Sequence, residues 1–163
     1  ANSFNHKFPN SLTIPQEKID KKVMTIPGTD GQKMSKSYNN FIDIFLPEKK
    51  LKKQIMSIKT DSISVDDPKN PDNCTVFKLF EIIADKSDVL ELEKKYRNGG
   101  YGYGHAKKDL FEVILEKYKS QRELYNHYIN NQSLIEQKLI KGAEKANEIA
   151  TTVLDRVRKN IGY

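Results

Sequence analysis

Hydrophobic residues recur at helical spacing through most of the chain, beginning at residue 47. Leu51, Ile55 and Ile58 follow Pro47 at intervals of four and three, and lysines occupy the opposite face. Proline suits the first position of a helix because it lacks an N–H that would stay unpaired there. The pattern predicts a helix that starts at Pro47 and ends before the polar stretch 60–73.

Four more helices are predicted after that stretch. One begins near residue 72 or 73, and a short one runs from the cap candidate Ser87 to the glycine pair 99–100. A long helix fits residues 105–130, and the last begins near residue 133. The first of these four is expected to bury Val76, Leu79, Phe80 and Ile83, and the long helix Leu110, Val113, Ile114, Tyr118, Leu124 and Tyr128. The last carries a stripe of small residues that lets a neighbouring helix approach closely: Ala143, Ala146, Ala150, Val153 and Val157.

Residues 1–46 lack this periodicity. Three prolines interrupt residues 1–28, and the apolar run 23–26 predicts a short strand. We therefore place a domain boundary between residues 46 and 47. The expected fold class is mainly α, with a helical bundle over 47–163 preceded by the short end of another domain, 1–46.

Composition limits the class of protein. With 163 residues, 37% of them hydrophobic, the chain can form one modest core, and no apolar run reaches the roughly 18 residues of a membrane span. The single cysteine, Cys74, excludes an internal disulfide and fits a reducing cytoplasm, and the scattered histidines predict no metal site. The net charge of +6 favours a polyanionic partner only modestly, because most basic residues are lysines. The chain starts at Ala1 without an initiator Met, so we expect it to come from a longer polypeptide.

The stretch 28–38, GTDGQKMSKSY, holds the candidate chemistry. Gly28 and Gly31 permit backbone angles that other residues avoid, so they are expected to act as hinges. Lys33 and Lys36 are flexible cations suited to phosphate oxygens whose charge moves during a reaction. The plainer interpretation is a solvated, lysine-rich turn.

The string KMSKS at residues 33–37 resembles the signature of class I aminoacyl-tRNA synthetases. Three more strings are similar to those of the tryptophanyl-tRNA synthetases: TDS at 60–62, GYG at 102–104 and GAEKAN at 142–147. The resemblance implies a Rossmann-type catalytic domain followed by an α-helical anticodon-binding domain. Because the chain has no HIGH-type string, residues 1–46 are expected to be the C-terminal remnant of the catalytic domain, and residues 47–163 the anticodon-binding domain.

The same resemblance implies a reaction and its residues. Tryptophan is activated by ATP, accompanied by Mg²⁺, and transferred to tRNA(Trp). Lys36, followed by Lys33, is the expected catalytic residue that stabilises the leaving pyrophosphate. The residues implied to contact ATP are Lys33, Met34, Ser35, Lys36 and Ser37, with Val23 or Met24 against adenine. Those implied to contact tRNA are Lys107, Arg122 and Lys145. The parent enzyme is expected to be a cytoplasmic homodimer, and the fragment alone inactive.

Three other interpretations stay open. The chain could be a stand-alone helical RNA-binding module that retains a relic of the loop, a fragment of a tyrosyl-type synthetase, or a helical scaffold without a nucleic-acid role. The glycine-rich stretch 99–104 is expected to connect two helices, because a helix end and not a strand precedes it.

Overall fold

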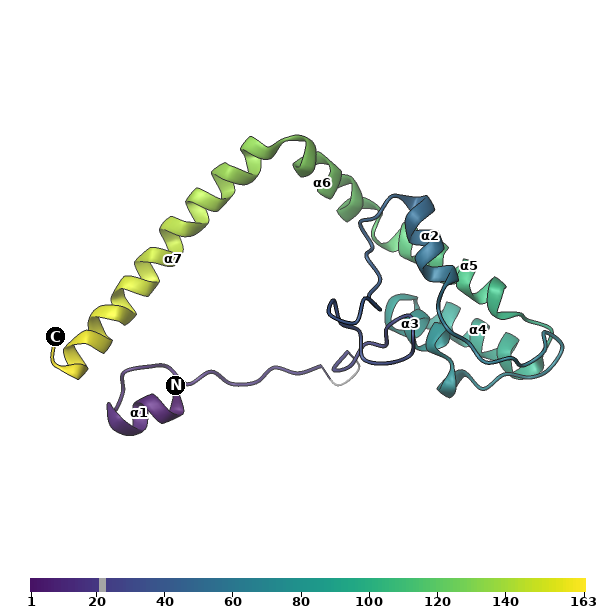
Figure 1. Ribbon diagram of the computed structural model, residues 1–163, viewed down its shortest axis with the longest axis horizontal. Coiled ribbons are helices and arrows are strands. Elements are labelled where there is room, and N and C mark those ends of the chain that lie inside the picture. The colour runs from purple at the N-terminus through teal and green to yellow at the C-terminus, as the bar shows by residue number, and fades with distance from the viewer. Residues whose placement is uncertain (21–22) are drawn as a thin grey trace. The chain divides into compact units, whose positions relative to one another are not determined.

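A computed structural model describes residues 1–20 and 23–163 of the chain. These residues form two compact units: Ala1–Ile19 with Asn126–Tyr163, called the first unit, and Asp20–Tyr125, called the second unit. Seven α-helices and one short 3₁₀ helix make up the regular structure of the described residues (Figure 1). The prediction of a mainly α fold is therefore confirmed. Within the described residues, no helix is both long enough and apolar enough to cross a membrane.

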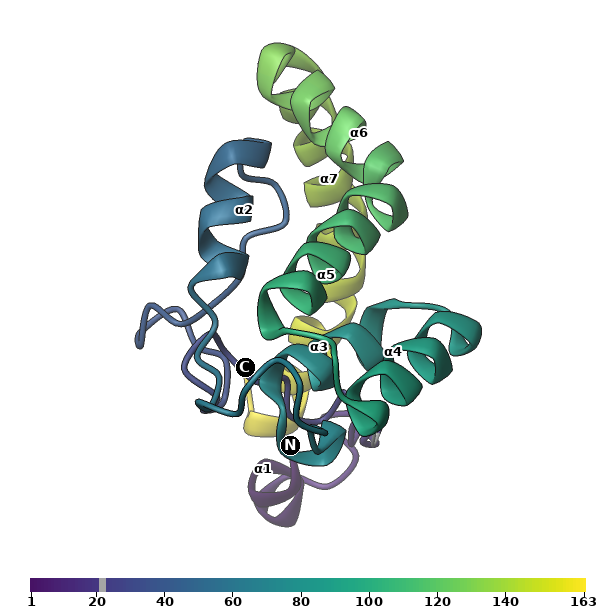
Figure 2. The same ribbon diagram turned by 90° about the vertical axis from the view of Figure 1, so that its right-hand side faces the viewer.

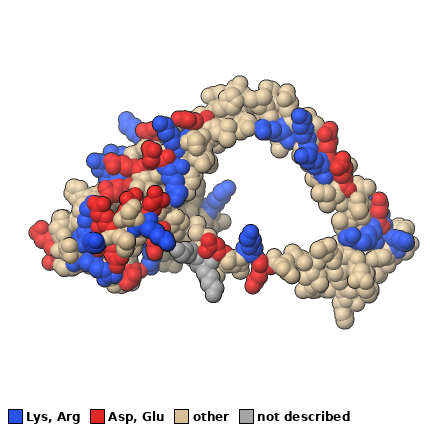
Figure 3. Space-filling view, turned by 180° about the vertical axis from the view of Figure 1, so that it is seen from behind, with Lys and Arg blue, Asp and Glu red and all other residues tan. Residues whose placement is uncertain are grey.

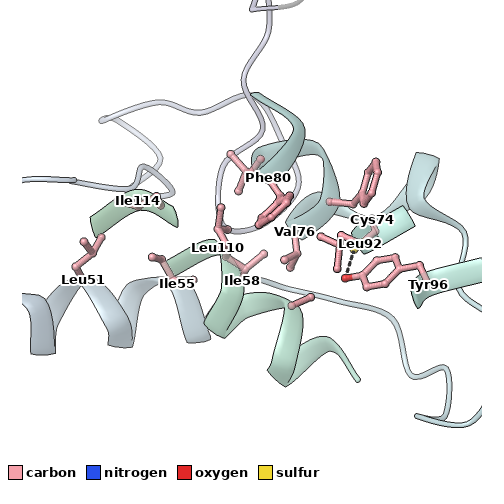
Figure 4. Packing of buried hydrophobic residues seen from close by; sticks show 13 residues of the cluster. Leu51, Ile55, Ile58, Cys74, Val76, Phe80, Leu92, Tyr96, Leu110 and Ile114 are labelled. Atoms are coloured by element: carbon pink, nitrogen blue, oxygen red, sulfur yellow. Dashed lines mark hydrogen bonds between the residues drawn. The ribbon is translucent and has the colours of Figure 1, made fainter. Parts of the chain in front are cut away.

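The second unit is built around one hydrophobic core. Helix α2 (Glu48–Met56) packs against α5 (Tyr103–Lys117), and α3 (Thr75–Ile83) packs against α5 and α4 (Lys86–Asn98) (Figure 2). The buried side chains interleave between these helices (Figure 4): Leu51, Ile55, Ile58, Cys74, Val76, Phe77, Leu79, Phe80, Leu92, Tyr96, Ala106, Leu110 and Ile114. The apolar stripe predicted for residues 51–58 is confirmed, because its three members are at most 1% exposed.

Helix boundaries differ from the predicted ones by one to three residues. Pro47 is the N-cap of α2 rather than its first residue, and α4 begins at Lys86, after the N-cap Asp85, rather than at the expected cap Ser87. A 3₁₀ helix, Pro71–Asn73, precedes α3 because the Asn70 side chain accepts a hydrogen bond from the Asp72 N–H. These differences arise where side-chain caps, rather than hydrophobic periodicity, decide the end of a helix.

The predicted long helix 105–130 is divided in two. Helix α5 ends at Lys117, and α6 (Lys119–Asn130) follows. Tyr118 lies between them, with φ −104° and ψ 16°. The Tyr118 N–H still reaches the Ile114 carbonyl at 3.1 Å, so the backbone hydrogen bonding continues into the junction. The expected connector at residues 99–104 is confirmed, since it joins α4 to α5.

The strand predicted for residues 23–26 is wrong. Residues 23–25 form a turn and bend, and the extended pairing among the described residues is a single antiparallel bridge between Pro27 and Lys33. A strand needs a neighbouring backbone to accept its N–H groups, and hydrophobic composition alone supplies none.

The first unit joins the two ends of the chain. The loop that follows helix α1 (Asn2–Lys7) contacts helix α7 (Gln132–Ile161) through side-chain hydrogen bonds. Arg156 Nε donates to the Ser11 carbonyl at 2.8 Å, and Asn160 Nδ2 donates to Ser11 Oγ at 2.8 Å. Helix α1 was not predicted, because it is only six residues long.

The small-residue stripe of α7 does not have the neighbour that was predicted. Ala143, Ala146 and Ala150 are exposed, and no helix among the described residues packs along them. Periodicity shows which face of a helix is apolar, but it does not show what covers that face. The boundary predicted between residues 46 and 47 does not coincide with the limits of the two compact units. The division into domains 1–46 and 47–163 stays a prediction.

Candidate functional site

The candidate site is the loop of residues 28–40 in the second unit, which starts as a tight reversal of the chain. The Gly28 N–H donates to the Gln32 carbonyl at 2.7 Å, and the Met34 N–H donates to the Ile26 carbonyl at 2.8 Å. Gly31 has a φ of 85°, a conformation that a residue with a Cβ rarely adopts. Position 31 therefore requires glycine as a turn residue, and the expected hinge motion stays a prediction.

Gly28 has a different role from the hinge that was expected. It has no positive φ, but a Cβ placed on it would come within 2.5 Å of the Asn40 side chain. Glycine is needed there because of close packing rather than backbone freedom.

A second turn presents the other half of the signature. The Ser37 N–H donates to Ser35 Oγ at 3.2 Å, and the Asn39 N–H donates to the Lys36 carbonyl at 3.1 Å. Asn39 has a φ of 51°, a left-handed conformation that asparagine tolerates better than most residues. Lys36 and Ser37 thus lie on a closed, solvent-exposed turn.

The side chains of the loop divide by exposure. Lys33, Lys36 and Ser37 are exposed, whereas Met34 is partly buried against the hydrophobic core. Neither lysine forms an ion pair with any residue that the structure describes. Two ammonium groups on one anchored loop can therefore bind an anion without first giving up a carboxylate partner.

A hollow of about 520 Å³ adjoins Lys36. Its other lining residues follow the loop directly: Phe41, Ile42, Asp43, Ile44 and Phe45. Phe45 stacks on Tyr125 with ring centroids 4.6 Å apart. This hollow supplies apolar surface beside the second lysine of the signature.

Asn40 and Asp30 support the loop from within, and the sequence analysis did not identify either residue. Asn40 is 2% exposed, and its side chain donates to Asp30 Oδ1 at 2.8 Å. This hydrogen bond is the main cause that lowers the pKa of Asp30 below its usual value. The signal available in the sequence was the pair Asn39–Asn40 directly after the stretch 28–38. Asparagine side chains often bond to nearby backbone groups.

Two of the residues predicted to contact tRNA have partners inside the second unit. Lys107 Nζ donates to the Met56 carbonyl at the end of α2 at 3.1 Å, and burial lowers the pKa of this lysine. Arg122 donates to the carbonyls of Ile44 and Leu46, the latter at 3.0 Å. These contacts hold helices α5 and α6 to the segment around α2, so both side chains have a structural role beside the predicted one.

The remaining predicted residues lie elsewhere. Lys145 is exposed on α7 in the first unit. Val23 and Met24 are 44% and 65% exposed and precede the loop. The structure thus brings together residues 33–37, and it does not gather the three expected tRNA contacts into one cluster of the second unit.

Charge on the second unit is mixed rather than uniformly basic. Lys and Arg side chains alternate with Asp and Glu over its helices (Figure 3). Three ion pairs join side chains four positions apart on α4 and α5: Lys95 with Glu91, Arg97 with Glu93, and Lys108 with Glu112. Charge pairs at this spacing stabilise an exposed helix, so these side chains need no nucleic-acid partner to account for them.

Comparison with known proteins identifies the family. Residues 1–119 match the family described as tRNA synthetases class I (W and Y). The tryptophan–tRNA ligase of Campylobacter jejuni (strain RM1221) is 42% identical over 158 residues, which are 97% of this chain and 50% of that protein. The tryptophan–tRNA ligase of Rhodopirellula baltica is 41% identical over 162 residues, 99% of this chain and 51% of that protein.

A solved structure agrees with these matches. The crystal structure of tryptophanyl-tRNA synthetase from Campylobacter jejuni, complexed with ADP and tryptophan, has a TM-score of 0.83 at 42% identity and covers 100% of this chain and 51% of that one. The chain thus spans about half the length of the relatives it matches. The resemblance seen in the KMSKS string is confirmed, and this chain belongs to the class I tRNA synthetases of the W and Y family.

Proposed function

We propose that this chain is part of a tryptophan–tRNA ligase and supplies the loop that acts on ATP. One observation carries the proposal: residues 33–37 expose two ammonium groups that form no ion pair with any described residue, on an anchored loop in a chain 42% identical to such ligases. Because the chain spans about half of those relatives, the complete reaction is proposed for a polypeptide of their length. We expect the isolated 163-residue chain to be inactive.

The proposed reaction has two steps. A carboxylate oxygen of tryptophan attacks the α-phosphorus of ATP, the bond from that phosphorus to the bridging oxygen breaks, and pyrophosphate leaves. A terminal ribose hydroxyl of tRNA(Trp) then attacks the carbonyl carbon of the adenylate, loses its proton, and releases AMP. The first step places additional negative charge on the departing phosphate oxygens, which is where the chain's lysines act.

Lys36 is the first candidate to stabilise that charge, and Lys33 is the second. Each is exposed and able to move toward phosphate oxygens, and each is a compact cation with three donors. Ser35 and Ser37 are proposed to contact the phosphates, and Met34 anchors the loop because it packs on the core. Val23 and Met24 are proposed to lie against adenine, the expected contact just upstream of the loop.

ATP is proposed as the nucleotide because the related structure was solved with ADP and tryptophan. Magnesium enters the proposal only as part of Mg-ATP. No group of three or more acidic, histidine or cysteine side chains that could ligate a metal lies among the described residues, so they do not fit a metal site of their own.

The remaining parts of the proposal concern partners. Lys107, Arg122 and Lys145 are proposed to contact tRNA(Trp), Lys145 being the one whose exposed ammonium has no structural partner among the described residues. The parent protein is proposed to act as a homodimer in the cytoplasm, as the resemblance implies.

The test is tryptophan-dependent exchange of labelled pyrophosphate into ATP by the natural full-length protein that contains this chain. We expect exchange with tryptophan and at least about 100-fold slower exchange, at equal concentration, with tyrosine. Exchange that prefers tyrosine would favour the tyrosyl-type alternative, and the absence of exchange with either amino acid would contradict the proposed function.

A further inference from the structure

We infer that Asn40 is a positioning residue for the ATP loop, because its buried amide fixes the backbone on both sides of Met34, between Lys33 and Lys36. The expected effect of Asn40 on catalysis rests on the proposed function, whereas its effect on the conformation of the loop does not. Asn40 lies three residues beyond the signature and touches no phosphate in the proposed reaction. It would act only through the groups that it holds.

Every hydrogen-bonding group of the Asn40 side chain has a partner in the loop. Oδ1 accepts from the Ser35 N–H at 2.7 Å, and Nδ2 donates to the Lys33 carbonyl at 3.1 Å and to Asp30 Oδ1 at 2.8 Å. An asparagine amide offers one acceptor and two donors, so this arrangement uses both kinds of group. No other residue type provides an acceptor and two donors in the same short, planar shape.

The backbone of Asn40 adds a fourth contact. Its carbonyl accepts from the Thr29 N–H at 2.8 Å, and the Thr29 carbonyl accepts from the Lys59 N–H at 2.7 Å. The loop is thereby tied, through Asn40 and Thr29, to the segment that follows α2. Motion of the loop away from the core must break this series of hydrogen bonds.

Two neighbours keep the amide in place. Gly28 leaves the space that Asn40 fills, because a Cβ at position 28 would lie 2.5 Å from Asn40 Cγ and Nδ2. Asp30 accepts from both the Asn40 side chain and, at 3.0 Å, the Gln32 N–H. The carboxylate therefore orients the amide so that its oxygen faces Ser35.

The location of these contacts explains why they matter for the lysines. The Lys33 carbonyl and the Ser35 N–H bracket one residue, so Asn40 holds the backbone from which the two ammonium groups extend. Loss of the amide frees that backbone, and cations that must first be ordered stabilise a transition state less well. Binding of tryptophan, which does not use the loop in the proposed reaction, should be unaffected.

The experiment uses the natural full-length protein and four forms of it: wild type, Asn40→Ala, Gly28→Ala and the control Asn39→Gly. Asn40→Ala removes the amide, and Gly28→Ala displaces it without changing it. Asn39 is exposed, its hydrogen bond to the described part of the chain comes from its backbone N–H, and it has a positive φ that glycine adopts readily, which makes it the matched control.

Two measurements are made on each form. The first is the kcat of tryptophan-dependent pyrophosphate exchange, together with the dissociation constant of tryptophan. The second is amide hydrogen exchange of the peptide 28–40. We expect Asn40→Ala and Gly28→Ala to lower kcat at least about 10-fold, to change tryptophan affinity less than about twofold, and to speed exchange of the peptide, while Asn39→Gly resembles wild type.

Each other outcome has a distinct meaning. If Asn40→Ala keeps the wild-type kcat or the wild-type protection of peptide 28–40, Asn40 does not position the loop and the inference is overturned. Equal losses in kcat and in tryptophan affinity would point to general damage and would also overturn it. If the wild type shows no exchange with any amino acid, the proposed function fails, and the protection of the peptide still decides the structural part.

Discussion

Lys69 is a charged side chain buried in the second unit, with 3% of its surface exposed. Its Nζ donates to the carbonyls of Ser64, Val65 and Asp67 at 2.8, 3.1 and 3.0 Å and lies 5.5 Å from the centre of the Tyr103 ring. All three donors of the ammonium are therefore used, which is how a buried lysine avoids a large desolvation cost. The lysine holds the polar stretch before α3 in one conformation.

We predict that Lys69→Met lowers the free energy of unfolding of the second unit by about 2 kcal/mol, because it leaves three carbonyls without their donor. The control is Lys94→Met on the exposed face of α4, which should change that free energy by less than about 0.5 kcal/mol. Amide hydrogen exchange of α4 and α5 in the full-length protein measures both values. Equal effects of the two variants would show that the Lys69 ammonium contributes nothing specific.

At the residue scale, the sequence pointed to exposed candidate side chains but missed buried ones whose hydrogen bonds depend on the fold. Residue type made Lys33 and Lys36 candidates, the resemblance implied their role, which stays a prediction, and the structure exposes both. Asn40 and Lys69 were missed because their roles depend on carbonyls and N–H groups that only the folded backbone brings within reach. The tRNA contact of Arg122 stays a prediction, and its two backbone carbonyl partners were not predicted.

Helix α5 is the central element of the second unit, since both α2 and α3 pack on it. Leu110 and Leu124 were both predicted to be buried, as members of one apolar stripe on one long helix. In the structure Leu110 is fully buried on α5, and Leu124 is 51% exposed on α6. Equal spacing along a sequence therefore corresponds to very different burial after the helix divides at Tyr118.

We predict that Leu110→Ala lowers the free energy of unfolding of the second unit by about 3 kcal/mol, the range expected when a buried leucine leaves a cavity. Leu124→Ala, the same substitution at an exposed position, should cost less than about 1 kcal/mol. Urea denaturation followed by hydrogen exchange of α3 and α5 compares them. Similar losses for the two variants would contradict the assignment of Leu110 to the core.

The existence of helices was easier to predict than their ends or any strand. Periodicity predicted α2, α3 and α5 because each buries one face in a common core, and α4 was predicted from the signals at its two ends. The strand at 23–26 was wrong because strand formation depends on a second backbone segment, which a local pattern does not specify. Helix ends at Lys86 and Lys117 depended on caps and junction geometry, not on spacing.

For the whole molecule, the sequence predicted a mainly α protein of the correct family but not its division into two units. The first unit combines residues from both ends of the chain, held by contacts such as Arg156 to Ser11. These partners are 145 positions apart, a separation that no local pattern specifies. By contrast, the family was predictable because its evidence is a short contiguous string, KMSKS, supported by three others.

The central claim is that the loop cations of this chain stabilise departing pyrophosphate, and it concerns the full-length protein. Lys36 is exposed and carries no ion pair among the described residues, so replacing it removes a cation without removing a structural contact. Lys78, exposed on α3, is the matched control for loss of one surface charge.

The most direct measurement is the kcat of tryptophan-dependent pyrophosphate exchange for wild type, Lys36→Ala and Lys78→Ala, at saturating tryptophan. We predict that Lys36→Ala lowers kcat about 100-fold with tryptophan affinity unchanged, because the cation acts on charge that develops only in the transition state. Lys78→Ala should exchange at the wild-type rate. A Lys36→Ala protein that exchanges as fast as the wild type would contradict the account.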